Sequence, residues 1–274
     1  MTGRFAIDAR LLAGPGGDAR WNNLGYWHDV DHYTAACQAL ARLHGEAAAL
    51  APGERVLELA CGRGAAVAMW RREFRVGAIA ALDLRGQCIA ALRDAPPVDS
   101  LTLAEGRFDL PLPPPLAGQL FDAVLCVDAA YHARSLAAFL ATAARALAPG
   151  GRLVFTTLMR APGDVPRNRR ARGAGRLALR VAGVPSASLA SETALRRAVA
   201  AHGLELLELR DLTSAVFPGF AAWVERRATE LSWRQRLSPA WLKIALTARL
   251  CRRLSASRQL AYVRVSARRA RADA

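Results

Sequence analysis

The residues best placed for chemistry in this 274-residue chain surround a glycine turn in its first half. Residues 55–64, Arg-Val-Leu-Glu-Leu-Ala-Cys-Gly-Arg-Gly, are typical of a short apolar strand that enters a tight turn, and a helical segment follows. Glycine lets the backbone approach a ligand, and the N–H groups of the first helical turn face that ligand. The segment therefore predicts a cradle for a nucleotide-like molecule.

The glycine spacing narrows the choice of ligand. A dinucleotide fingerprint needs Gly-x-Gly-x-x-Gly, but its third position here is Val67. The alternative frame, acidic-x-small-x-Gly-x-Gly, runs through Glu58, Ala60, Gly62 and Gly64. It resembles motif I of the class I methyltransferases that use S-adenosylmethionine (SAM), although that family often has glycine where Ala60 stands. A glycine turn of some other α/β domain is the alternative interpretation.

Apolar strand patterns alternate with helical patterns along the chain. Strands are expected near residues 55–60, 77–83, 100–104, 121–127, 152–158, 205–209 and 259–266. This alternation demands an α/β fold with a mostly parallel sheet covered on both faces. The resemblance implies a Rossmann-like class I methyltransferase domain with seven strands and a helical lid insertion before the last strand.

We divide this expected single domain, residues 1–274, by its sequence pattern. The parts are a loose Gly-rich start within an N-terminal lid and helix (1–50), a SAM-binding core (51–160) and substrate-side lid elements (161–190 and 212–256). Two helices are expected within the second lid segment, at about 219–230 and 239–254.

Ligands of such sheets bind at the carboxyl ends of the strands. Asp83 ends the second strand roughly 20 residues after the turn, where a carboxylate accepts hydrogen bonds from both ribose hydroxyls. Capping of the next helix is the alternative role. The resemblance implies that Leu84, Arg107, Phe108 and Val127 complete the SAM site, with Phe108 against the adenine or simply packed in its loop.

Residues 126–132, Cys-Val-Asp-Ala-Ala-Tyr-His, resemble the segment after strand four in small-molecule methyltransferases of the ubiquinone, tocopherol and natural-product type. The turn at 147–153 matches them too, so the resemblance covers about 23–157. In related sugar and polyketide O-methyltransferases a histidine at this place is proposed as general base. The resemblance thus implies a catalytic role for His132, with Tyr131 beside it.

The partner of this histidine is open. The related enzymes can pair it with an acidic residue on strand five, where this chain has Thr156 and Thr157. Asp128 is one candidate to orient the imidazole. The alternative is that His132 only lines the pocket or bonds its own loop.

Residues 22–27, Asn-Asn-Leu-Gly-Tyr-Trp, resemble a segment that folds over SAM in the same subgroup. Tyr26 or Trp27 would then close the site and exclude water. The alternative is that these aromatic side chains pin the N-terminal segment to the core, and both roles are compatible.

The net charge of +15 comes almost entirely from arginine and favours anionic partners. A nucleic acid or protein acceptor is our second hypothesis. It is disfavoured because the sequence has no Asp/Asn-Pro-Pro-aromatic motif and no RNA-binding module. A non-catalytic SAM-binding protein is a third. The five cysteines lack metal-ligand spacing, so no metal site is expected.

The apolar, basic character of 212–256 predicts a small hydrophobic acceptor such as a lipid, quinone, sterol or polyketide. O-methylation, with S-adenosylhomocysteine (SAH) as product, is the leading reaction, and C- or N-methylation is the alternative. Helix 239–254 is basic and amphipathic, which fits either peripheral membrane contact or a core-facing helix with a solvated face. The sequence has no long uncharged apolar stretch, so we expect a cytoplasmic location.

Overall fold

The computed structural model describes residues 8–94, 100–161, 179–180 and 182–271. Its sheet contains β1 (Arg55–Leu59), β2 (Ala78–Asp83), β3 (Leu101–Glu105), β4 (Phe121–Cys126), β5 (Leu147–Arg160), β6 (Ala190–Ser191), β7 (Leu204–Asp211) and β8 (Leu260–Arg269). The strand order is β3-β2-β1-β4-β5-β8-β7, and the two-residue β6 pairs with β5. Among the described strands, β8 alone runs in the opposite direction, so it pairs antiparallel with β5 and β7. The predicted α/β class and mostly parallel seven-strand path are confirmed.

The apolar strands form a buried parallel sheet because helices cover both of its faces. Successive side chains of β1 alternate between the faces, so that Val56 joins one hydrophobic cluster while Leu57 and Leu59 join the other. Trp70 is buried on the first face and Phe139 on the second. The strand order reverses between β1 and β4, which is the switch point where ligands of such folds bind.

Five helices of the described residues cover the two faces of the sheet. The first face carries α2 (Tyr33–Ala47), α3 (Ala65–Phe74) and α4 (Gly86–Arg93), and the second carries α5 (Leu136–Ala146) and α7 (Glu192–Ala201). Serine side chains cap the N-termini of the last two: Ser135 Oγ accepts from Ala138 N at 3.1 Å, and Ser191 Oγ from Ala194 N at 3.3 Å.

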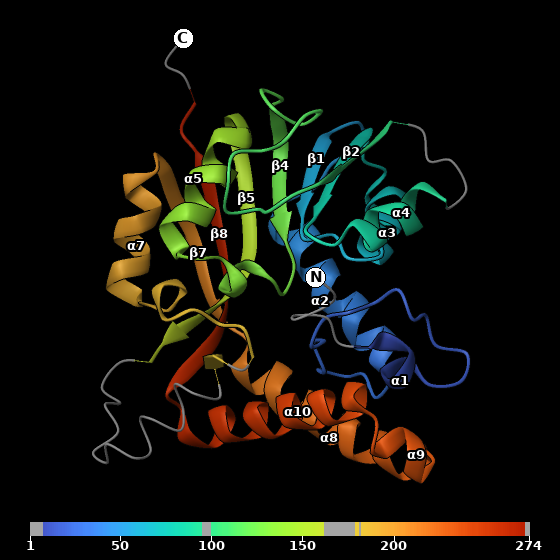
Figure 1. Ribbon diagram of the computed structural model, residues 1–274. Helices are drawn as coiled ribbons and strands as arrows, with labels where there is room; N and C mark the ends of the chain where they lie inside the picture. The colour runs from blue at the N-terminus through green and yellow to red at the C-terminus, as the bar shows by residue number, and fades with distance from the viewer. Residues whose placement is uncertain (1–7, 95–99, 162–178, 181, 272–274) are drawn as a thin grey trace.

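A layer of helices lies across the carboxyl ends of the central strands (Figure 1). It consists of α8 (Thr213–Glu230), α9 (Trp233–Arg236) and α10 (Pro239–Ser257). We expected α8 to begin near residue 219, after Pro218, but it begins six residues before that position. Asp211 Oδ1 accepts from Thr213 N at 2.8 Å and stabilises this earlier start. Of the predicted lid segment at 161–190, residues 162–178 and 181 lie outside the described residues.

The prediction of a loose N-terminus is wrong for residues 8–20. This segment forms the short helix α1 (Ala9–Ala13), in which Leu12 is buried. Trp223 Nε1 donates to the Leu12 carbonyl at 3.1 Å, and Arg227 Nε donates to the Leu11 carbonyl at 3.0 Å. The segment is ordered because side chains of α8 bind its backbone, a contact that local sequence does not reveal.

Asp128 fastens the N-terminal segment to the sheet. Its Oδ2 accepts from Leu24 N, and its Oδ1 accepts from the hydroxyl groups of Tyr131 and Tyr262, each at 2.7 Å. Burial raises the pKa of this carboxyl to about 6, while the three hydrogen bonds favour the ionised form. One side chain therefore joins three segments that are far apart in the sequence.

We expect Asp128→Asn to release the N-terminal segment. The amide nitrogen cannot accept from Leu24 N, and asparagine still tolerates the left-handed backbone found here (φ 55°). The free energy of unfolding should fall by about 1–3 kcal/mol, the cost of an unsatisfied buried donor. Urea denaturation and proteolysis near Arg20 measure both effects.

Asp122→Asn is the control, because Asp122 also accepts one backbone N–H, from Arg55 at 2.8 Å, at an exposed position. Equal stability and equal cleavage of the two variants would contradict this role of Asp128.

Candidate active site

The glycine turn after β1 adopts the left-handed backbone that its sequence requires. Ala60, Gly62 and Gly64 have φ values of 62°, 58° and 75°. A Cβ at Gly64 would lie 2.0 Å from Leu92 Cδ2, so glycine here lets α3 start directly against α4. Gly64 thus shapes the turn, while Ala60 and Gly62 line a cavity beside it.

Asp83 locks this turn to the end of β2. Its buried carboxylate accepts from Gly62 N at 2.8 Å. It also accepts from Arg85 N and Nε, at 2.9 Å each, and from Arg85 Nη2 at 3.2 Å. The sequence interpretation did not anticipate Arg85, whose guanidinium occupies both carboxylate oxygens. Ribose binding by Asp83 stays a proposal, and it requires this guanidinium to share or release the carboxylate.

Glu58 lies behind the same turn. Its carboxyl is buried and accepts from Trp70 Nε1 at 2.9 Å. Burial raises the pKa of Glu58 to about 8, and the nearby charge of Asp83 adds to this increase. A cation bound in the adjoining cavity would reverse this effect and stabilise the carboxylate.

The cavity has a volume of about 250 Å³ and lies between the strand ends and the helical layer. Its wall includes ten of the predicted site residues: Glu58, Ala60, Gly62, Asp83, Leu84, Arg107, Phe108, Val127, Tyr131 and His132. Apolar side chains of other elements complete the wall, among them Leu158, Val184, Phe217, Leu250 and Leu254. The topology thus brings residues from most of the predicted strand ends together.

The aromatic residues Tyr26 and Trp27 are not part of this wall. Trp27 N donates to the Ala215 carbonyl at 2.8 Å, and its ring lies 5.9 Å from that of Trp223. Residues 20–24 of the same segment line the cavity instead. Trp27 therefore anchors the segment on α8, and the preceding residues cover the site.

His132 ends the short 3-10 helix η1 (Ala130–His132). Its Nδ1 lies 3.0 Å from the carbonyl oxygen of Gly183, which can only accept, so Nδ1 carries the proton and Nε2 the lone pair. Burial lowers the pKa of His132, the positive charge of Lys243 lowers it further, and the bond to Gly183 opposes them. These effects favour the neutral imidazole, and the partner of Nδ1 is a backbone carbonyl rather than Asp128, which was one candidate.

Tyr131 and Asp128 form a separate unit beside His132. The Tyr131 hydroxyl donates to Asp128, and burial with this neighbouring charge raises the pKa of Tyr131 well above its usual value. Thr156 Oγ1, on β5, accepts from Asp128 N at 2.7 Å. Tyr131 thus positions the loop that carries His132, and its hydroxyl group keeps its proton, which it shares in a hydrogen bond with Asp128.

The residues after β3 line the cavity and also hold their own loop together. Arg107 Nε and Nη2 each donate to Asp109 at 2.8 Å, so this side chain braces the loop. Phe108 packs edge-to-face on Phe139, with ring centroids 6.0 Å apart, and one side of it borders the cavity. An adenine contact for Phe108 stays a proposal.

Sequence reasoning missed Arg85, Gly183 and Lys243. The carbonyl of Gly183 has no sequence signal, because any residue supplies one. Lys243 had a signal: it is the only lysine in a chain that uses arginine elsewhere, and it lies on an amphipathic helix. The described residues hold no group of three or more His, Cys, Asp or Glu that could bind a metal ion.

The comparisons with known proteins agree with this geometry. A family model described as a methyltransferase domain matches residues 26–209. Over 120 residues the chain is 35% identical to a fatty-acid O-methyltransferase of Mycolicibacterium smegmatis, a match that spans 43% of this chain and 42% of that enzyme.

Two solved structures share the fold. A mycolic acid cyclopropane synthase complexed with SAH and CTAB has a TM-score of 0.75 at 14% identity, covering 95% of this chain and 93% of that one. The 4+2 cyclase SpnF has a TM-score of 0.67 at 19% identity, covering 91% and 87%.

The chain therefore belongs to the methyltransferase domain family. It has the class I fold, and it is a SAM-dependent methyltransferase with SAM as its cofactor. The residues present fit that cofactor: a left-handed turn of small residues and two buried carboxyl groups face one cavity.

We expect Asp83→Ala to weaken SAM binding at least tenfold, because a charge-assisted contact to the ribose is worth about 1.5–3 kcal/mol. Isothermal titration with SAM and SAH measures it. Glu54→Ala is the control, since Glu54 also pairs with an arginine, Arg152, but does not line the cavity. Unchanged affinity in a folded Asp83 variant would contradict the assignment.

Proposed function

We propose that this enzyme transfers the methyl group of SAM to an oxygen atom of a small hydrophobic acceptor. The observation that carries the proposal is the composition of one continuous cavity. Its wall joins the glycine turn and Asp83 to apolar side chains of the helical layer, including Phe217, Leu250 and Leu254. The relative that acts on fatty acids, by its name, supports a lipid-like acceptor.

For methyl transfer the protein mainly has to place the methyl group and the acceptor atom relative to each other. When bound, SAM supplies an electrophilic methyl group on a sulfonium sulfur. Residues of the turn and of β2 hold one end of the cavity, and the apolar wall holds the acceptor, so that the reacting atoms meet in line. Residues 20–24 cover the site and keep water away from it.

His132 lines this cavity, and its role depends on whether the acceptor oxygen belongs to a hydroxyl or to a carboxylate group. A hydroxyl acceptor must lose a proton, and the lone pair on His132 Nε2 can take it. A carboxylate acceptor has no proton to lose at neutral pH. Methylation at carbon or nitrogen is the second candidate, favoured only by the breadth of reactions among proteins of this fold.

For a hydroxyl acceptor we expect His132→Ala to lower turnover about 10²–10⁴-fold, the usual contribution of a general base. SAM affinity should stay within about twofold, because His132 lies away from the turn. Steady-state kinetics and calorimetry on the same preparation measure the two quantities.

The pH profile gives a second readout of His132. Since burial lowers the pKa of His132 below the ordinary value of an imidazole, wild-type turnover of a hydroxyl acceptor should be level around neutral pH and fall at acidic pH, as the imidazole gains a proton. The variant should lack this acidic limb. A limb that persists without His132 would contradict its role as base.

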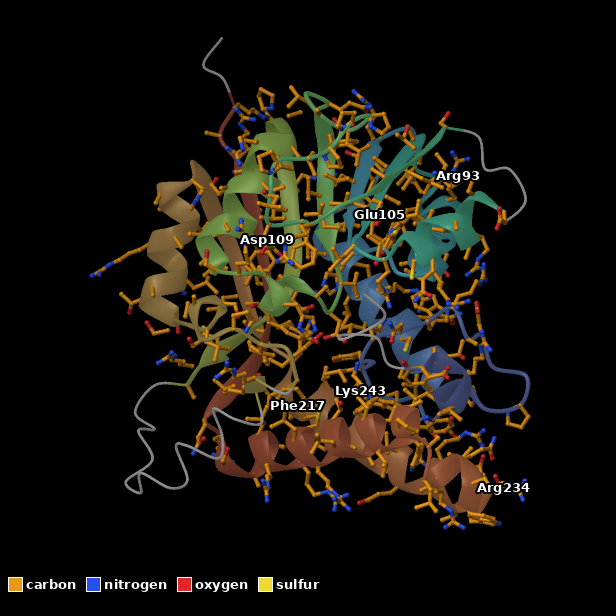
Figure 2. All side chains as sticks on the ribbon, in the orientation of Figure 1. Arg93, Glu105, Asp109, Phe217, Arg234 and Lys243 are labelled. Atoms are coloured by element: carbon orange, nitrogen blue, oxygen red, sulfur yellow. The ribbon has the colours of Figure 1, made fainter. Side chains whose placement is uncertain are left out.

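We also propose that the outer face of the helical layer contacts an anionic lipid surface. Large apolar side chains are exposed on consecutive turns there: Trp233 (63%), Leu237 (65%), Leu242 (55%) and Leu246 (48%). Residues 231–258 contain six arginines and one lysine but no Asp or Glu. Figure 2 shows Arg234 at the outer end of this layer, directed away from the cavity. Basic charge around exposed apolar groups is complementary to anionic headgroups.

The position of this face matches the proposed acceptor. Leu246 and Leu250 line both the cavity and an outer groove bordered by Arg249, Arg252 and Arg253. A lipid-like acceptor would therefore pass from the surface to the site along α10. None of the helices in the described part of the chain is long and apolar enough to cross a membrane.

We expect the protein to float with vesicles that contain phosphatidylglycerol and not with pure phosphatidylcholine. The variant Trp233→Ser, Leu237→Ser, Arg249→Gln, Arg253→Gln should lose this binding, because it removes both apolar and basic contacts. Arg196→Gln with Arg197→Gln, on α7, is the control for charge alone. Equal flotation of the first variant and wild type would contradict the surface.

A further inference from the structure

Lys243 occupies the side of α10 that borders the cavity. Lys243, Thr247, Leu250 and Leu254 follow the spacing of one helical face, and all four line the cavity wall. Trp241, Ile244 and Ala248 on the adjacent face are buried in the core, while Leu242 is exposed. Figure 2 shows Lys243 between α10 and the sheet, near Phe217. The only lysine of the chain therefore lies at an apolar part of the site.

Three arginines of the cavity wall form ion pairs with carboxylates. Arg20 pairs with Asp18, Arg85 with Asp83 and Arg107 with Asp109, at 2.8–2.9 Å. Bidentate pairs of this kind hold guanidinium groups in place. Lys243 lies near enough to His132 for its positive charge to lower the pKa of that imidazole, and near enough to Arg85 for the charge of Arg85 to lower its own pKa. Lys243 therefore makes the electrostatic potential around His132 more positive.

Burial and the charge of Arg85 lower the pKa of Lys243. Both effects disfavour an ammonium group in this position, and an anion bound beside it would offset both. The structure therefore places a cation in the cavity wall, next to side chains that would pack on a hydrocarbon chain.

We propose that Lys243 binds the carboxylate of a long-chain acid, and that this acid is the methyl acceptor. The inference rests on the proposed O-methyl transfer and names its substrate class. A single ammonium group matches one monovalent carboxylate, whereas a phosphate dianion typically needs several donors. The cavity wall beyond Lys243, formed by Leu250, Leu254 and Phe217, receives the hydrocarbon chain.

The reaction then balances without a base. One carboxylate oxygen forms a bond to the methyl carbon, and the bond from that carbon to sulfur breaks with its electron pair left on sulfur. The products are a neutral methyl ester and SAH, and no proton is released. His132 lies beside the carboxylate but takes no proton in this reaction. Substitution of His132 should therefore change the turnover of an acid only a few-fold.

The change in charge also favours release of the product. The acid binds through an ion pair in a partly buried site, where such a contact is stronger than in bulk water. The ester has lost its charge and keeps only the apolar contacts. Lys243 thus discriminates between substrate and product.

The test compares binding of hexadecanoate and its methyl ester, measured by displacement of a fluorescent fatty acid from the SAH-loaded protein. Wild type should bind the acid at least about tenfold more tightly than the ester. Lys243→Gln should abolish this preference, and Lys243→Arg should keep part of it. Arg197→Gln, an exposed position on α7, removes the same charge and should behave as wild type.

Turnover provides the second arm. Lys243→Gln should raise KM for hexadecanoate about tenfold or more while SAH affinity and the thermal midpoint stay at wild-type values. If Lys243→Gln keeps the preference for acid over ester, the carboxylate subsite is wrong. If the acid binds through Lys243 but is never methylated, the subsite stands and the proposed O-methyl transfer is wrong.

Discussion

The carboxylate of Asp128 is the constraint on which the arrangement of this site depends. It accepts hydrogen bonds from Leu24, Tyr131 and Tyr262, which lie on the N-terminal segment, the loop after β4 and the last strand. Burying a carboxylate is unfavourable unless its oxygens are satisfied, and here every donor comes from a different element. The cover over the cavity, the loop of His132 and the antiparallel strand β8 are therefore fixed relative to one another.

The charges of the cavity are divided between its two ends. The turn end has Glu58 and Asp83, which suits a cofactor with a sulfonium and an ammonium group. The α10 end has Lys243 beside the neutral His132, within apolar walls, which suits an anion on a hydrocarbon chain. Two ligands of opposite charge would meet between these ends. With the proposed acid as acceptor, the field of the site would favour the substrates over the products, since the sulfonium and the carboxylate both lose their charge on methyl transfer.

The local sequence pattern was enough to predict the part of the site that lies on the alternating strands and helices. The strand, glycine turn and helix around Gly62, and the acid at the end of β2, could be predicted because alternating strands and helices place all strand ends at one edge. Helix bounds were least certain where proline disrupts the pattern, so the start of α8 was missed. The order of residues 8–20 was missed because side chains of α8, some 200 residues later, bind that backbone.

The partners within the site were harder to predict. His132 is oriented by a backbone carbonyl from Gly183, and Lys243 reaches the cavity from a helix outside the alternating core, so both contacts depend on how distant segments pack. The pair of Asp83 with Arg85 is local, but it depends on the conformation of a long side chain rather than on any motif. The proposed acceptor part of the cavity is lined by the helical layer, whose sequence pattern predicts its contacts least well.

The most direct test of the account is to follow the methyl group itself. The enzyme is incubated with SAM that carries a labelled methyl group and with hexadecanoate, and the organic extract is analysed by mass spectrometry before and after alkaline hydrolysis. The account predicts label in a methyl ester that alkali releases as methanol, in equal amount to the SAH formed. Label that resists alkali, or SAM binding without any labelled organic product, would contradict it.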